Sequence, residues 1–234
     1  MNQRFHAMHV LDEPVVVVQP VARSFHARYA GRTVVAVGAH PDDVELGIGG
    51  TLAALSEGGA RVVMAICSVP VNLEMRCAEA KAAAEILGCE LKFLMPDECR
   101  RIEDLKSYQL VRMLDDLVKE YSPAALITHG PNDFHHDHVA VYHAAVSTQR
   151  LSQFDFYSYM PTMCRPVPVP FQPRAFIDIS NTIEKKIKAI AAHPSQFSSR
   201  GVTFELYRDI ARVTGRMCGV EYAEGLDIGR MVFA

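Results

Sequence analysis

Apolar runs alternate with amphipathic stretches along the chain from about residue 33 onward. Residues 33–39 are apolar throughout and rich in β-branched side chains, which is typical of a strand buried on both faces, and the other short runs are mostly apolar. The stretches between them have helical periodicity, and several end at glycine. The pattern predicts strands at 33–39, 61–68, 91–95 and 124–130 and helices at 49–59, 74–88, 107–123 and 137–149.

This alternation predicts an α/β fold of Rossmann-like type: a doubly wound, mostly parallel sheet with helices on both faces, in a single domain. The last third is less regular. It has strand patterns at 154–161 and 175–180, helical patterns at 181–193 and 203–219, and a proline-rich stretch at 160–173. Asn181 is expected to cap the first of these two helices.

The first 32 residues lie outside the alternation. Val15–Val18 is a β-prone apolar run bracketed by prolines, and such a strip is normally covered by pairing or packing. We therefore expect residues 1–32 to form an N-terminal extension, either an extra strand or an oligomer contact, ahead of one domain at 33–234.

Composition limits the classes of function. The 234 residues are 49% hydrophobic and 22% charged, and the net charge of −3 is spread without a basic stripe, which argues against nucleic acid and anionic membrane as partners. No apolar run approaches the ~20 residues that span a bilayer. The six cysteines form no C-x-x-C pair and the N-terminus lacks a signal-peptide pattern, so we expect free thiols and a cytoplasmic location.

Two polar clusters follow predicted strands. His40-Pro41-Asp42-Asp43 comes after the first strand, and residues 135–138, His-His-Asp-His, come after the fourth. The carboxyl ends of the strands are where open α/β sheets bind ligands. A plain turn would explain the proline and one capping aspartate, and a solvated loop would explain part of the second cluster. Neither explains adjacent carboxylates beside several histidines, which favours a bound cation.

Imidazole and carboxylate without thiolate suit zinc, with iron, cobalt or manganese as substitutes. A hydrolytic zinc site has three protein ligands and a position open to water. His40 and Asp43 are close enough in sequence to bind one ion, and a histidine of the second cluster would complete the set. The glycines at 47, 49 and 50 do not match a dinucleotide-binding loop, because Leu52 stands where the third glycine is required.

Four motifs in order resemble those of the PIG-L/LmbE-like N-deacetylases, zinc enzymes that remove acetyl groups from N-acetylglucosamine-type amines. They cover roughly residues 33–200, and the N-terminal extension is a departure from the family pattern. The motifs are A-H-P-D-D-V-E at 39–45, R-x-x-E…L-G at 76–88, H-H-D-H at 135–138 (with His136 in place of proline) and D-I-S…K…A…H-P-S-Q at 178–196.

The resemblance implies one zinc ion per chain, with His40, Asp43 and His138 as its ligands. It implies that Asp42 is the general base for a metal-activated water that attacks the acetyl carbonyl.

By the same resemblance, His135 is the second catalytic group, stabilising the oxyanion, and Asp137 fixes the tautomer and charge of His135. Either Asp42 or His135 delivers the last proton to the leaving amine. Arg76 is expected to bind a substrate hydroxyl or phosphate. His193 is expected either to contact substrate or to serve in packing or at an interface.

The resemblance thus implies a catalytic domain that deacetylates an amino sugar or sugar conjugate, a small N-acylated molecule. A zinc amidase acting on a non-sugar N-acyl compound is the alternative within enzymes. A non-catalytic zinc-binding protein is the alternative outside them, and an intact Asp42 and His135 argue against it. Family members are often trimers or hexamers, so we expect a homo-oligomer.

Overall fold

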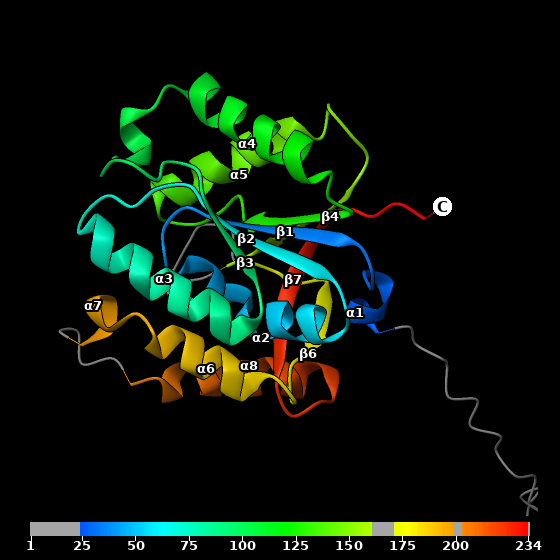
Figure 1. Ribbon diagram of the computed structural model, residues 1–234. Coiled ribbons are helices and arrows are strands. Elements are labelled where there is room, and N and C mark those ends of the chain that lie inside the picture. The colour runs from blue at the N-terminus through cyan, green and yellow to red at the C-terminus, as the bar shows by residue number, and fades with distance from the viewer. Residues whose placement is uncertain (1–23, 161–170, 199–202, 234) are drawn as a thin grey trace, which may run out of the picture.

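The computed structural model describes residues 24–160, 171–198 and 203–233. In this part of the chain, strands and helices alternate as the sequence predicts (Figure 1). The strands are β1 (Thr33–Gly38), β2 (Arg61–Ile66), β3 (Glu90–Phe93), β4 (Ala125–His129), β5 (Asp155–Tyr159), β6 (Ala175–Asp178) and β7 (Ala223–Arg230). The helices are α1 (Phe25–Arg28), α2 (Asp43–Glu57), α3 (Leu73–Leu87), the 3-10 turn η1 (Ile102–Asp104), α4 (Ser107–Tyr121), α5 (His136–Thr148), α6 (Ile183–Ala191), α7 (Pro194–Phe197) and α8 (Glu205–Cys218).

The described strands form one sheet in the order β3-β2-β1-β4-β5-β7-β6. The first five are parallel, and β7 runs antiparallel to both β5 and β6. The chain winds outward from β1 through β2 to β3, then returns to place β4 on the other side of β1. The predicted doubly wound, mostly parallel sheet is therefore confirmed, and its order reverses between β1 and β4.

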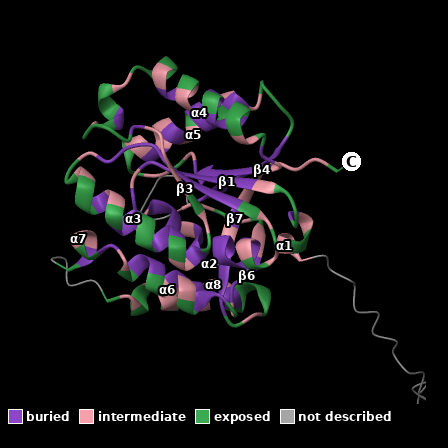
Figure 2. Ribbon diagram, in the orientation of Figure 1, coloured by how far each residue is buried: buried purple, intermediate pink, exposed green. Residues whose placement is uncertain are grey.

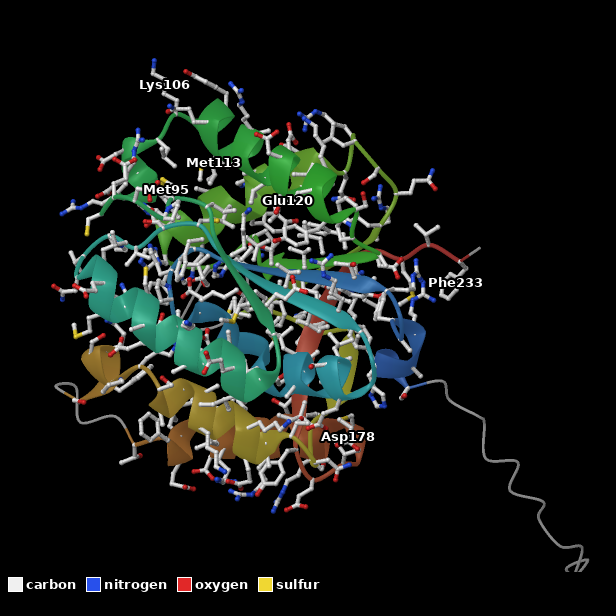
Figure 3. The ribbon with its side chains drawn as sticks, viewed as in Figure 1. Met95, Lys106, Met113, Glu120, Asp178 and Phe233 are labelled. Atoms are coloured by element: carbon white, nitrogen blue, oxygen red, sulfur yellow. The ribbon has the colours of Figure 1, made fainter. Side chains whose placement is uncertain are left out.

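Helices cover both faces of the sheet, α4 and α5 on one side and α2, α3, α6 and α8 on the other (Figure 1). Side chains fill the space between these layers, and the central strands are buried throughout (Figures 2 and 3). Alternate residues of β1 point into opposite cores: Val34 and Ala36 pack under α2, whereas Val35 and Val37 pack under α4 and α5. This two-sided burial explains why β1 has no polar alternation.

Besides the short helical segments α1, η1 and α7, which were not predicted, the structure differs from the sequence prediction as follows. The helix expected at 49–59 begins at Asp43, because α2 continues across a break at Ile48. Thr182, not Asn181, is the residue before α6, and it makes no side-chain capping bond. Strand β7 was not predicted, because its two glycines and its charged residues hide the apolar pattern that a strand normally shows.

Residues 24–32 pack against the domain. The Tyr29 hydroxyl is fully buried and lies 2.7 Å from Asp155 Oδ2 and 2.8 Å from the Tyr157 hydroxyl. Arg28 donates to the same carboxylate. The Val15–Val18 run, for which an extra strand or subunit contact was expected, lies outside the described residues. Within the described ranges, none of the helices has the length and hydrophobicity to cross a membrane.

Candidate functional site

Both polar clusters lie where the order of the sheet reverses. The loop 39–42 leaves β1, and the loop 130–135 leaves the neighbouring strand β4. Because the strands are parallel, their carboxyl ends meet at the same edge, and adjacent connections diverge there to opposite faces. The fold therefore brings residues almost 100 positions apart into one crevice.

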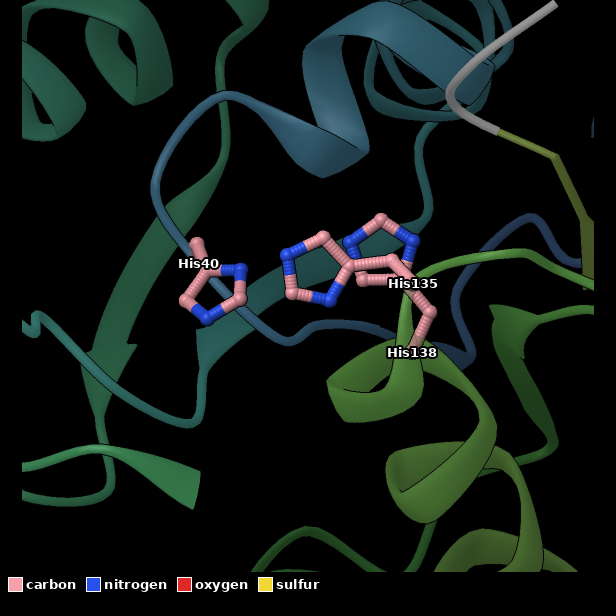
Figure 4. A group of neighbouring side chains, drawn as sticks. All are labelled: His40, His135 and His138. Atoms are coloured by element: carbon pink, nitrogen blue, oxygen red, sulfur yellow. The ribbon is translucent and has the colours of Figure 1, made fainter. Parts of the chain in front are cut away.

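Three predicted metal ligands converge in this crevice. The His138 Nε2 atom lies 3.2 Å from Asp43 Oδ1, and the His40 Nδ1 atom lies 3.7 Å from Asp43 Oδ2. The ring of His135 stacks on that of His138, with centroids 4.4 Å apart, and faces His40 (Figure 4). Ligand atoms of His40, His135 and His138 all lie within 4.8 Å of one another. The Asp43 carboxylate therefore lies next to a ring nitrogen of each of the two predicted histidine ligands.

In both His40 and His138, the ring nitrogen on the side away from Asp43 lies beside a further carboxylate. His40 Nε2 lies 3.0 Å from Asp137 Oδ2, and His138 Nδ1 lies 2.7 Å from Asp133 Oδ2. A carboxylate can only accept, so these nitrogens carry the protons. The lone pairs of His40 Nδ1 and His138 Nε2 are consequently the ones directed at Asp43. This carboxylate–histidine arrangement is the one that orients metal ligands in proteins.

The charges of the site favour a cation at this point. Burial opposes protonation of His138, but the carboxylates of Asp43 and Asp133 outweigh it and raise its pKa to about 10. The same negative surroundings favour a metal ion in place of that proton. Asp42 differs from its neighbour: burial, followed by the charge of Asp43, raises its pKa to about 7. A carboxylate of this kind is poised to accept a proton near neutral pH.

The backbone at Asp42 is unusual. Its φ of 93° lies in the left-handed region, directly before the first turn of α2. This conformation is uncommon for residues other than glycine, and it clusters at functional sites. It is braced by Arg76, whose guanidinium donates to the Pro41 carbonyl at 2.9 Å and lies 3.8 Å from Asp42 Oδ1.

His135 lies at the mouth of the site, exposed, as the residue that caps α5. Its Nδ1 accepts a bond from the backbone N–H of Asp137 at 3.3 Å, which leaves the proton of the neutral ring on Nε2. We expected the Asp137 side chain to fix the tautomer of His135. In the structure the backbone of Asp137 has that role, and its carboxylate binds His40 instead. His136 is exposed.

The two residues expected to bind substrate are both buried. His193 is inaccessible to solvent, and its Nε2 lies 2.8 Å from Glu45 Oε1, which is equally buried. The structure gives His193 a packing role, joining α2 to the segment that leads into α7, in place of substrate contact. Arg76 is 5% exposed and holds the loop that carries Asp42.

His129 is a third histidine beside Asp43, but it is not available as a ligand. Its Nε2 accepts a hydrogen bond of 2.9 Å from the Ala39 N–H, which can only donate. Complete burial lowers the pKa of His129 to about 4, so the ring is neutral. It fixes the end of β4 to the end of β1.

The residues present therefore fit a divalent cation. Two oriented imidazole nitrogens and one carboxylate are a typical donor set for a hydrolytic metal site with an open position. No cysteine belongs to either of the described groups that can hold a metal. The donor types exclude a thiolate site and agree with zinc, iron, cobalt or manganese.

Comparison with known proteins agrees with this geometry. Residues 35–148 match the family model described as PIG-L, GlcNAc-PI de-N-acetylase. The chain is 30% identical to the uncharacterized deacetylase YaiS of Escherichia coli (strain K12), over 69% of this chain and 90% of that protein.

Two further relatives match over more of the chain. The diacetylchitobiose deacetylase of Thermococcus kodakarensis is 25% identical, over 83% of this chain and 82% of its own. The crystal structure of a conserved protein of Thermus thermophilus, TT1542, superposes with a TM-score of 0.72 at 25% identity, covering 87% of this chain and 97% of that one.

The chain belongs to the PIG-L family. The resemblance drawn from the sequence motifs is confirmed, and with it the class of enzyme: the chain is a hydrolase of the N-deacetylase type.

The structure also explains the PIG-L motifs that lie outside the two loops of the crevice. Glu79 of the R-x-x-E motif accepts bonds from the backbone N–H and the hydroxyl of Ser195, at 2.8 and 2.6 Å. Ser195 belongs to the H-P-S-Q motif, whose His193 is bonded to Glu45 beside the metal loop. These contacts tie α3 and α7 to the start of α2, so the motifs share a structural task.

Asp133 was not predicted, although it lies five residues before His138 in a loop recognised as polar. Its Oδ1 accepts from the His135 N–H at 3.0 Å while Oδ2 holds His138 Nδ1. Asp133→Asn can keep the first bond through its amide oxygen but then presents an NH₂ group to His138 Nδ1. That nitrogen must become the acceptor, and the proton moves to Nε2, the atom needed for metal.

We expect Asp133→Asn to weaken zinc binding about 10–100-fold, the usual cost of losing such a partner. Competition with a chromophoric chelator measures it. Asp178→Asn is the matched control, because Asp178 makes the same kind of turn contact, to the Ser180 N–H, at an exposed site on β6. Equal zinc affinity in the two variants would contradict the assignment.

Proposed function

We propose that the chain removes the N-acetyl group from an amino sugar or amino-sugar conjugate, with one zinc ion bound by His40, Asp43 and His138. The observation that carries the proposal is the convergence of the two histidine lone pairs on Asp43, beside the half-buried carboxylate of Asp42. The description of the family and the diacetylchitobiose deacetylase among the relatives support an N-acetylated amino sugar as the substrate.

Each residue of the crevice has a separate task in this proposal. When bound, the cation supplies Lewis-acid chemistry, making a water more acidic and polarising the acyl carbonyl. Asp42 takes the proton of the attacking water, for which its pKa of about 7 suits it. His135 holds its proton on Nε2 at the mouth of the site, where it donates a hydrogen bond to the developing oxyanion. The proton that Asp42 has taken from the water then passes to the leaving amine. Arg76 keeps Asp42 in its left-handed conformation.

An activity screen of the zinc-loaded protein tests the proposal. The substrates are N-acetylglucosamine, diacetylchitobiose and non-sugar N-acetyl amines, and release of acetate and of free amine is measured. We expect turnover of at least one amino sugar and none by His138→Ala, which retains two ligands, too few for a tight zinc site.

The outcomes separate the alternatives. Turnover restricted to non-sugar amides would replace the proposal by a zinc amidase. Stoichiometric zinc binding without turnover of either class would favour a non-catalytic zinc protein.

We also propose a cytoplasmic location. The support is that five cysteines of the described residues are free thiols, which persist in a reducing compartment. Their positions are 67, 77, 89, 99 and 218.

A further inference from the structure

Helix α8 presents its apolar side chains to solvent. Ala211 and Gly215 form its buried face, and the helix packs against β6 and β7 (Figures 1 and 2). A Cβ atom on Gly215 would lie 2.7 Å from the Glu221 carbonyl oxygen, so the turn that follows α8 folds back closely against this face of the helix. Three large apolar residues lie outside this contact: Leu206 is 47% exposed, Val213 62% and Met217 66%. A helix that covers a core normally buries its large apolar side chains and exposes its polar ones.

Together with the half-buried Ile210, these three residues form one continuous row. Leu206, Ile210, Val213 and Met217 are spaced by four, three and four positions, and at 100° per residue they lie within about 60° of one another. We name them the α8 stripe. The stripe is directed about 180° away from Gly215. Spacing of this kind is the a/d pattern by which one helix packs against another.

The charges beside the α8 stripe indicate what covers it. Asp209 and Arg216 flank the stripe on the same side, one heptad apart. In an antiparallel pair of α8 helices related by a two-fold axis, Asp209 of each copy lies beside Arg216 of the other. The surface is therefore self-complementary in charge as well as in its apolar pattern, as an isologous contact requires. Asp209 also forms an ion pair with Arg212 of its own helix. Because this pair is exposed to solvent, it contributes little to stability.

We propose that the α8 stripe is a homodimer contact, occupied by α8 of a second copy in antiparallel orientation. The 14-residue helix is about 21 Å long, so the helix pair alone buries less than the roughly 800 Å² per chain of a standard interface. We therefore expect a weak dimer, whose population depends on protein concentration. A two-fold contact is compatible with the hexamer expected from the family resemblance and does not by itself build a trimer.

Sedimentation of the full-length chain over roughly two decades of concentration tests the proposal. Val213→Glu places one carboxylate from each copy near the two-fold axis of the dimer, where the two repel each other. We expect it to raise the dimer dissociation constant at least roughly 30-fold, as for the loss of a central interface residue. Tyr108→Glu is the matched control, because Tyr108 is 66% exposed on α4 in the other helix layer. Circular dichroism and thermal melting check that both variants fold.

Charge reversal tests the orientation. Asp209→Arg and Arg216→Asp should each weaken the dimer, because each sets like charges beside one another, and the double variant should restore it. A parallel pair would not show this rescue.

Any of the following results would overturn the proposal: a wild-type mass independent of concentration and unchanged by Val213→Glu, an equal effect of Tyr108→Glu, or no rescue in the double reversal. A monomeric chain whose melting temperature falls on Val213→Glu would show that another segment of the same chain covers the stripe, and would overturn it too.

Discussion

Asp42→Asn is expected to keep the proposed zinc ion and the fold while turnover falls by about 10²–10⁴, the usual contribution of a general base. The amide matches the carboxylate in size but cannot take a proton from water. Asparagine is also one of the few residues that tolerate the left-handed backbone found here, φ 93°. Asp42→Ala would add backbone strain to the chemical loss, so asparagine is the sharper variant.

The measurement pairs kcat with zinc content by elemental analysis. Loss of kcat at full zinc occupancy, with KM changed little, is the signature of a residue that acts in the chemical step. Asp137→Asn is the control, because it removes a carboxylate of the same crevice that supports His40 rather than the water, and it should lower zinc affinity more than kcat at saturating zinc. Near-normal kcat in Asp42→Asn would remove Asp42 from the role of base.

The order of elements and the position of the crevice could be predicted from the sequence because both depend on local pattern. Buried parallel strands are uniformly apolar, and a polar cluster directly after two such strands must lie at one edge of the sheet. His40, Asp43 and His138 therefore came together as expected.

The partners of these residues could not be predicted, because each contact depends on how loops fold in space. Asp133 and Asp137 both flank His135, and no spacing rule says that one holds His138 and the other His40. His193 lies in a family motif, which does not reveal that its ring is buried against Glu45. Strand β7 was missed for a related reason: its Glu224 points into the interior, where an apolar residue would have marked a strand.

Glu224 is buried because α2 is broken at Ile48, where φ is −140° and ψ is 20°. The break exposes backbone groups of α2 to the interior. The Glu224 carboxylate accepts from the N–H groups of Gly50 and Thr51, at 3.0 and 2.6 Å, as a cap inserted from β7. Lys186 of α6 forms an ion pair with Glu224 and donates to the Leu46 carbonyl at 2.7 Å. Glu224 thus binds the N–H groups that follow the break, and Lys186 binds a carbonyl that precedes it.

Lys186→Met should lower the free energy of unfolding by about 3–5 kcal/mol, because it leaves the buried Glu224 charge without its partner. The neighbouring Lys185→Met is the matched control: Lys185 pairs with Glu57 at 2.7 Å on the surface, and its loss should cost less than about 1 kcal/mol. Urea unfolding of the metal-free proteins measures both. The double variant Lys186→Met/Glu224→Gln should be more stable than Lys186→Met alone, since it removes the orphaned charge together with its partner.

Lys186→Met should also affect the proposed metal site. Asp43 stands in the first turn of α2, on the far side of the break from the residues that Glu224 caps. If the Lys186–Glu224 pair holds the two halves of α2 at their angle, Lys186→Met should weaken zinc binding in whatever remains folded, whereas Lys185→Met should leave it unchanged. Equal losses of stability in the two lysine variants would show that the buried pair does not support the break. A large loss of stability with unchanged zinc affinity would show that the first turn of α2 is held in place by the contacts of the crevice itself.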